Sequence, residues 1–326
     1  MKRFQDILCV VEPGDKSKDA LERAVTLAQN NQASLTAVAV AEVVTAGIGM
    51  PESGPISADL QEALVSARAQ EMEGRIDPYR KRIDIKTKVL VGVPFLEIIR
   101  EVLRSGHDLV IKAPENPDWL ERLFGSDDMH LLRKCPCPVW LVKHQAPKSY
   151  RRILAAVDAD EDHPKDELKT RHALNQQILQ MASSLALSDF AELHVVHAWH
   201  AVGESAMHGA FLHASAKEIV AYVEQTRLKH EASLQNIVRE MIGNAGSDAA
   251  DFLKPQSHLL KGSARKEIPA FAKRIDADLV VMGTVGRAGV PGFFMGNTAE
   301  SILEQIDCSV LAIKPPGFVT PVTLVD

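Results

Sequence analysis

Residues 108–112 read Asp-Leu-Val-Ile-Lys, and residues 278–282 read Asp-Leu-Val-Val-Met. Each is a short apolar run behind an aspartate, which is typical of a buried strand in a parallel sheet. The two runs lie 170 residues apart, and their surroundings repeat at the same distance. The shared residues are Gly92, Glu97 and Ile98 in the first copy and Gly262, Glu267 and Ile268 in the second.

Further along, a second set of residues repeats at a distance of 171, which indicates a one-residue insertion. Its members are Leu132, Cys137, Val139 and Lys143, with Leu303, Cys308, Val310 and Lys314 as their counterparts. An internal repeat of this length predicts two copies of one domain. We place the domains at residues 1–146 and 150–326, joined by a short polar piece.

Within each half, apolar runs alternate with helical patterns. The expected strands are Ile7–Val11, Leu35–Val44, Ile85–Val91, 108–112 and Val139–Lys143, followed by Ile153–Val157, Leu193–Trp199, His258–Leu260, 278–282 and Val310–Lys314. Long polar helices are expected near Asp59–Tyr79 and Lys217–Met241. This alternation predicts an α/β fold with two doubly wound, Rossmann-like parallel-sheet domains in tandem. Such sheets bind ligands beyond the carboxyl ends of their strands.

Composition argues against several classes of function. The net charge is −6 and no basic stripe is visible, so direct nucleic-acid binding is not expected. No stretch approaches the roughly 18 apolar residues of a membrane-spanning helix, so no membrane insertion is expected. The four cysteines do not form a disulfide framework, and Cys135-Pro136-Cys137 lacks the two-residue spacer of redox and zinc motifs. The cytoplasm is the expected location.

The most informative stretch is 282–300, which reads MGTVGRAGVPGFFMGNTAE. It starts where a strand ends and finishes where a helical pattern begins. Gly283 and Gly286 let backbone N–H groups approach a ligand without a Cβ in the way. The helix start stabilises an anion such as phosphate, and Arg287 can reach the same charge. We expect Asn297 or Thr298 to cap this helix, with Glu300 completing a capping box.

Two known phosphate motifs are excluded for this stretch. No Gly-Lys-Ser/Thr occurs in the chain, so it is not a Walker A loop, and the Gly-x-Gly start of the dinucleotide fingerprint is missing. A glycine loop that only caps a helix remains the alternative.

The spacing resembles that of the universal stress protein family. Nucleotide-binding members carry Gly, two residues, Gly, nine residues, then Gly followed by Ser or Thr. Here Gly283, Gly286 and Gly296 keep both spacings, while Asn297 departs from the Ser/Thr and Thr298 supplies a hydroxyl next to it. The resemblance covers both halves and is to the tandem type found in enteric bacteria.

This resemblance implies that the second half binds ATP, with Mg²⁺ as an option. It implies that Asp158 lies near the ribose and that Ala198, which follows a histidine, meets the adenine. Ala156 and Met282 complete the predicted nucleotide-binding set. It also implies a regulatory or protective role under stress, including exposure to DNA-damaging agents.

The first half departs from the pattern. Ala113 and Asn116 replace the first two glycines, Glu12 replaces the aspartate, and only Gly125 with Ser126 survives at the helix start. Weak or absent ATP binding is therefore expected there. Trp119 and Phe124 either line an apolar pocket or simply pack.

Two other functions stay open beside ATP binding. One is a weak ATP hydrolase that uses the same pocket, and the other is a carrier or scaffold whose first half holds an apolar or sugar-nucleotide ligand. No general base is identifiable, so no catalytic residue and no dedicated enzyme are expected. The histidines of the second half show no recognised zinc spacing, so no metal site is expected; they are His194, His197, His200, His208 and His213.

The last strand of each half is an apolar edge, which invites strand addition. The family resemblance implies that these two edges pair, so that the tandem chain forms an internal pseudo-dimer. A homodimer of the whole chain is a further option.

Overall fold

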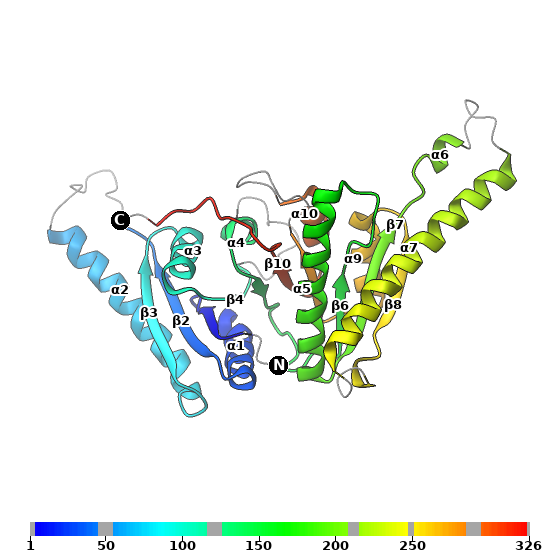
Figure 1. Cartoon of the computed structure of the whole chain (residues 1–326). Helices are drawn as coiled ribbons and strands as arrows, with labels where there is room; N and C mark the ends of the chain where they lie inside the picture. The colour runs from blue at the N-terminus through cyan, green and yellow to red at the C-terminus, as the bar shows by residue number, and fades with distance from the viewer. Residues whose placement is uncertain are drawn as a thin grey trace. The chain divides into compact units, whose positions relative to one another are not determined.

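The computed structural model describes residues 4–44, 55–115, 126–207, 215–246, 251–284 and 295–324 (Figure 1). The chain divides into two compact units. The first contains the described residues of Met1–Lys148 and Cys308–Asp326 together with Met295, and the second contains those of Ser149–Ala288 and Gly296–Asp307. Residues from Cys308 onward therefore belong to the first unit, although they lie in the second half of the sequence.

The first unit is built on a mostly parallel sheet. Its strands are β1 (Asp6–Val10), β2 (Ser34–Ala41), β3 (Ile85–Val91), β4 (Leu109–Lys112), β5 (Val139–Leu141) and β10 (Ser309–Ile313), and its α-helices are α1 (Lys18–Asn31), α2 (Pro55–Ile76), α3 (Pro94–Ser105) and α4 (Asp127–Lys134). The strands lie in the order β3-β2-β1-β4-β5-β10. Only β10 runs against its neighbour here, with Leu311 opposite Trp140 of β5.

The second unit repeats the order of the first four of these strands. Its strands are β6 (Arg152–Ala156), β7 (Glu192–Trp199), β8 (Gln256–Lys261) and β9 (Leu279–Gly283), and its helices are α5 (Lys165–Asp189), α6 (Glu204–Met207), α7 (Ala216–Ala245), α9 (Ala264–Arg274) and α10 (Asn297–Leu303). The strands lie parallel in the order β8-β7-β6-β9, with Leu154 beside both His194 and Val280. The α/β fold predicted from the sequence is confirmed.

Helices cover both faces of the sheet in the second unit. In Figure 1, α5 and α7 lie on the near face, and α9 lies behind the strands. The central strands are therefore buried on both sides, and Leu154 and Val280 have no exposed surface. This double burial explains why these strands read as continuous apolar runs.

The order of the strands fixes where a ligand can bind in this unit. The chain moves outward from β6 to β7 and β8, then returns through α9 to β9 on the other side of β6. Connections after β6 and β9 therefore leave in opposite directions, which opens a crevice at their carboxyl ends. Asp158 follows β6 and Gly283 ends β9, so both lie at this crevice.

The described helices give one further fact about the molecule. None of them combines the length and the apolar character that a membrane crossing requires.

Candidate functional site

A cavity opens in the second unit where β6, β7 and β9 end beside the first turn of α10. Its volume is about 340 Å³, which falls in the range of small-molecule sites. Leu174 and Ile178 from α5 and Ile268 from α9 supply apolar walls. Polar groups enter from the strand ends, so the cavity combines an apolar body with a polar rim.

Most of the predicted nucleotide-binding residues meet at this cavity. Those that line it are Ala156, Asp158, Ala198, Met282, Gly283, Gly296 and Thr298. Asn297 is described, but it is not among the lining residues. Gly286 and Arg287 lie outside the described residues. The structure thus gathers residues that the sequence scatters over more than 140 positions, from 156 to 298.

Gly283 has a packing reason to be glycine. A Cβ at this position would lie 2.6 Å from Cδ2 of Leu174, which reaches over it from α5. Such a contact is too short for carbon atoms, so a side chain here would force the Leu174 side chain to move. Gly283 therefore has two roles: the expected access of ligands to the backbone, and close packing against Leu174 of α5.

The start of α10 differs from the expected capping. Gly296 is the N-cap residue, with φ −62° and ψ 134°, and no side chain caps the helix. Asn297 is the first helical residue, so the prediction that Asn297 or Thr298 caps the helix with Glu300 is wrong. The Gly296 amide donates instead to the Thr284 carbonyl at 3.0 Å, which ties the helix start to the end of β9.

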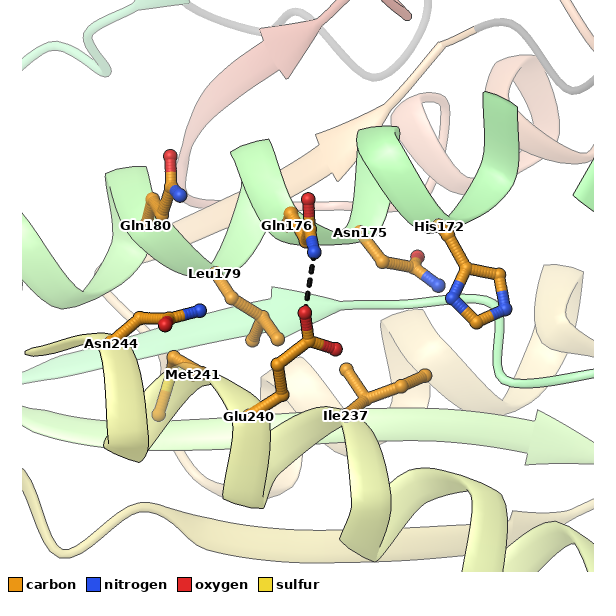
Figure 2. Close-up of a pocket in the computed structure, with 9 residues that line it drawn as sticks. All are labelled: His172, Asn175, Gln176, Leu179, Gln180, Ile237, Glu240, Met241 and Asn244. Carbon is orange, nitrogen blue, oxygen red and sulfur yellow. Dashed lines mark hydrogen bonds between the residues drawn. The ribbon is translucent and has the colours of Figure 1, made fainter. Parts of the chain in front are cut away.

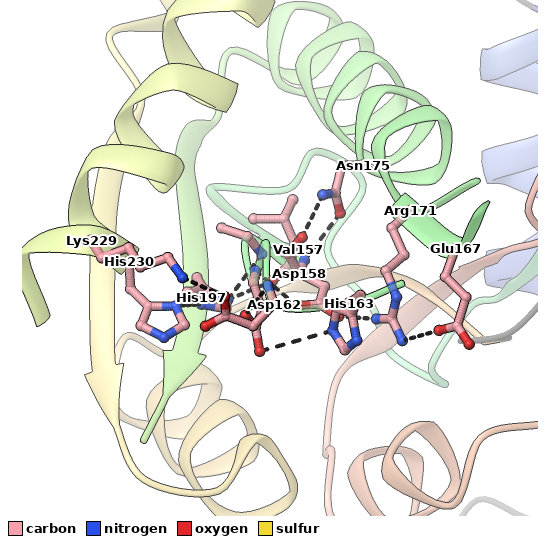
Figure 3. Close-up of polar contacts among 12 residues, drawn as sticks. Val157, Asp158, Asp162, His163, Glu167, Arg171, Asn175, His197, Lys229 and His230 are labelled. Carbon is pink, nitrogen blue, oxygen red and sulfur yellow. Dashed lines mark hydrogen bonds and ion pairs between the residues drawn. The ribbon is translucent and has the colours of Figure 1, made fainter. Parts of the chain in front are cut away.

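Asp158 is held in place by α5 and by its own loop (Figure 3). The Arg171 guanidinium forms an ion pair with Asp158 Oδ2 and lies 3.4 Å from Glu167 Oε2. His163 Nε2 lies 3.6 Å from the same Asp158 oxygen. The Asn175 side chain accepts from the Asp158 amide at 3.0 Å and donates to its carbonyl at 2.7 Å. Both the backbone and the carboxylate of Asp158 are therefore fixed in orientation.

A buried pair of histidines lies beside this carboxylate. The amide of Ala159 donates to His197 Nδ1 at 3.2 Å, and His197 Nε2 lies 3.0 Å from His230 Nδ1 of α7. His197 Nδ1 also lies 3.4 Å from the Val157 carbonyl, but its shorter contact is with the Ala159 amide, so we assign the proton of the neutral ring to Nε2, which then donates to His230. Burial lowers the pKa of His197 against the opposing charge of Asp158, which favours this neutral form. The sequence predicted a buried strand histidine, but not its partner on α7.

A wider hollow continues from the cavity along β7 and α7. It shares Asp158, His197 and Thr298 with the cavity. Trp199 and Tyr222 line its far part, where the Tyr222 hydroxyl donates to the Val202 carbonyl at 2.9 Å. The cavity is therefore continuous with a hollow that Trp199 and Tyr222 help to line.

A second indentation, between α5 and α7, is a packing crevice (Figure 2). Its volume is only about 20 Å³, which is enough for roughly one water molecule. Gln176 Nε2 donates to Glu240 Oε1 across it at 2.6 Å. This crevice is too small for a ligand.

The counterpart position in the first unit is filled by an ion cluster. Lys112 stands where the second half has Met282, and its side chain is 2% exposed. Its ammonium forms an ion pair with Asp128 and lies 3.3 Å from Glu12 and 3.8 Å from Glu115. Burial, followed by the charge of Asp128, raises the pKa of Glu115 to about 7. Carboxylates outnumber the cation in this cluster, which disfavours a phosphate.

Several other predicted features cannot be followed in the structure. Trp119, Phe124, His208 and His213 lie outside the described residues. Within the described part of the chain, no three His, Cys, Asp or Glu side chains are arranged to hold a metal ion.

Residues 3–143 and 149–314 both match the sequence model of the Universal stress protein family. The chain therefore belongs to this family, with a matched region in each half. Universal stress protein E of Escherichia coli (strain K12) is 30% identical over 330 residues, which cover 100% of this chain and 99% of that protein. Universal stress protein E of Photorhabdus laumondii is 28% identical over 331 residues, which cover 99% and 98%.

Solved structures show the same likeness. A functionally unknown protein, PA1789 from Pseudomonas aeruginosa PAO1, has a TM-score of 0.67 at 27% identity, covering 96% of this chain and 94% of that one. A universal stress protein from Archaeoglobus fulgidus has a TM-score of 0.61 at 18% identity, covering 97% and 98%. The second comparison shows likeness of fold alone.

Proposed function

We propose that the second half of this protein binds ATP in the cavity between β6, β9 and α10, as a regulatory or structural ligand in the cytoplasm. The observation that carries the proposal is the convergence of Ala156, Asp158, Ala198 and Gly296 on one cavity at the point where strand order reverses. These residues come from separate elements that are distant in the sequence.

Each part of ATP has a matching region in the proposed mode. The adenine packs near Ala198 and the apolar wall, and the ribose hydroxyls donate to Asp158. The phosphates face Gly296 and Thr298 at the start of α10, where no side chain caps the helix. Gly296 has no Cβ, which leaves room for a phosphate oxygen near the backbone.

We propose binding rather than rapid hydrolysis. Hydrolysis of ATP needs a group that orients the attacking water. Among the described lining residues, the Asp158 carboxylate is ion-paired with Arg171, and both nitrogens of His197 have hydrogen-bonding partners. Neither side chain is therefore placed to act as a general base.

The test is to extract nucleotide from freshly purified protein, identify it by mass spectrometry, and measure ATP binding by calorimetry with and without Mg²⁺. Gly296→Val should abolish retention, because valine tolerates the backbone angles of Gly296 but its side chain fills the approach to the helix start. The matched control is Gly243→Val, an exposed position of α7 with nothing within 4 Å of an added Cβ. Equal retention in both variants would contradict the proposed site.

The fate of bound ATP and its role in the cell need separate measurements. ATP that stays intact for hours supports a binding role, whereas accumulating ADP would instead indicate a weak hydrolase. We propose that the bound form protects cells under stress, including exposure to DNA-damaging agents. A strain without the gene should lose survival under such agents and regain it with the Gly243→Val gene but not with the Gly296→Val gene.

A further inference from the structure

Two cysteine side chains of the first unit lie in direct contact. Cys135 follows α4, Cys137 precedes β5, and their sulfur atoms are 3.6 Å apart. None of the four cysteines is in a disulfide. In a disulfide the two sulfurs lie about 2.05 Å apart, so the pair has to approach further for the bond to form.

The backbone holds the two thiols in this arrangement. The Cys135 amide donates to the Leu131 carbonyl at 2.9 Å at the end of α4, and the Pro138 carbonyl accepts from the Val110 amide at 3.0 Å. Hydrogen bonds thus fix the chain on both sides of the pair. Pro136 lies between the cysteines, and its ring removes one backbone torsion from the segment. The backbone hydrogen bonds of the segment between α4 and β5 therefore keep the two sulfurs in contact.

A buried lysine gives the pair a suitable electrostatic setting. Lys314 follows β10, is buried, and donates to the carbonyl of Leu132 in α4. Burial raises the pKa of Cys135, but hydrogen bonds with Cys137 lower it, with a smaller contribution from Lys314, whose own pKa is lowered by burial to about 7. The same hydrogen bond raises the pKa of Cys137. The pair therefore loses its first proton more readily than its second.

The two remaining cysteines lack this setting. Burial raises the pKa of Cys9 to about 12, which leaves it as an inert thiol. Cys308 directly precedes β10 and is buried. Cys137 is 8% exposed and is flanked by the half-buried Pro136 and Pro138, so this segment reaches the surface.

We propose that Cys135 and Cys137 form a redox-active dithiol that a peroxide converts into a disulfide. The thiolate of the pair attacks one peroxide oxygen, the O–O bond breaks, and a sulfenic acid and a hydroxide form. The second sulfur then attacks the sulfenic sulfur, the S–S bond forms, and the S–O bond breaks with loss of water. Two thiols are oxidised, one peroxide is reduced, and the two thiol protons leave in the products.

The disulfide would tie the end of α4 to the start of β5 across a single proline. A sequence pattern with one residue between the cysteines differs from the two-residue spacing of thioredoxin-like motifs. The spacing of the cysteines therefore does not predict this chemistry, which is inferred from the contact between the two sulfurs.

The test uses the full chain, reduced and then exposed to hydrogen peroxide. Remaining thiols are alkylated after acid denaturation, and the peptides are mapped by mass spectrometry. We expect the peptide with Cys135 and Cys137 to lose two hydrogens and to resist alkylation, while Cys9 and Cys308 stay alkylated. Thiol reductant should restore both thiols, because a disulfide is reversible and a sulfinic acid is not.

Variants separate the disulfide from other oxidation. Cys137→Ser and Cys135→Ser should form no disulfide, and Cys137→Ser, which keeps the thiol of lower pKa, should instead accumulate a sulfenic acid that dimedone traps. Cys308→Ser is the matched control and should behave like the unchanged chain. Circular dichroism reports whether each variant folds, and Cys135→Ala serves if the serine disturbs the buried site. Four intact thiols after peroxide treatment, or a disulfide that maps to another pair, would overturn the proposal.

Discussion

At the scale of single residues, Asp158 and Arg171 make a sharp prediction about ribose recognition. Arg171 holds one oxygen of the Asp158 carboxylate, and Asp158 faces the proposed ribose. Arg171→Met removes this support and should weaken ATP binding about tenfold, the usual cost of losing a charged hydrogen bond. Calorimetry with ATP measures the loss.

A second ligand shows whether Arg171 acts on ATP through Asp158. If Arg171 acts through Asp158 on the ribose hydroxyls, Arg171→Met should hardly change the affinity for 2′,3′-dideoxy-ATP, which lacks them. An equal loss for both ligands would show that Arg171 contacts the phosphates or the base instead. A wild-type chain that binds neither ligand would refute the proposed function itself, so the two failures are distinguishable.

Lys112 makes a prediction about stability. Lys112→Met leaves the buried Asp128 carboxylate without its cation and should lower the free energy of unfolding by about 3–5 kcal/mol. The double variant Lys112→Met with Asp128→Ala introduces the residues of the second half, Met282 and Ala299, and should recover most of this loss. Urea unfolding of the three proteins checks both steps. A double variant as unstable as the single one would contradict this explanation.

How far the site could be predicted also depends on individual residues. The family resemblance placed Asp158 and Gly296 in the predicted nucleotide-binding set, and both residues line the cavity. Arg171 and Asn175 were missed because they lie on one face of α5 among many polar residues, and only folding turns that face toward Asp158. His230 was missed for the same reason, since 33 residues separate it from His197.

At the scale of elements, β7 and β8 carry a second histidine pair that predicts a pH effect. His194 Nδ1 lies 3.0 Å from His258 Nε2, and the His258 ring centroid is 4.4 Å from that of Phe271 on α9. Burial, followed by the charges of His194 and Arg274, lowers the pKa of His258 to about 4. An unfolded histidine titrates near pH 6.5.

The sign of this effect follows from the two pKa values. Between about pH 6.5 and pH 4 the unfolded chain binds a proton that the folded chain refuses, so stability falls as the pH is lowered through this window. Above it, His258 contributes no pH dependence. His258→Phe should flatten the fall in unfolding free energy between pH 7 and pH 4.5. An unchanged slope in urea titrations at these pH values would contradict the assignment.

Elements differ in how well the sequence predicts them. Buried strands such as β6 and β9 were predicted to within one residue at each end, because a short apolar run between polar turns is typical of a buried strand. The cap of α10 was predicted wrongly because Asn297, Thr298 and Gly296 can all start a helix, and the contact of Gly296 with Thr284 decides between them. That contact joins two elements and has no local signature in the sequence.

At the scale of the whole molecule, the two halves should differ in ligand binding. The first unit has Lys112 with an excess of carboxylates at the counterpart of Met282, which lines the cavity of the second unit. We expect a single nucleotide per chain, measured by calorimetry, and no binding at all in Gly296→Val. Bound ATP should raise the unfolding free energy by about 2.7 kcal/mol at a free concentration roughly 100 times Kd. Two nucleotides per chain would contradict this difference.

The pairing of β5 with β10 has a consequence for how the protein is made. Residues of β10 follow the whole of the second unit's strands in the sequence, yet they complete the sheet of the unit that is translated before it. That unit must wait with an unpaired apolar edge while the rest of the chain is translated, and such edges recruit other strands. Premature termination before residue 309 should therefore yield nascent chains that depend on chaperones, whereas release of the full-length chain ends that dependence.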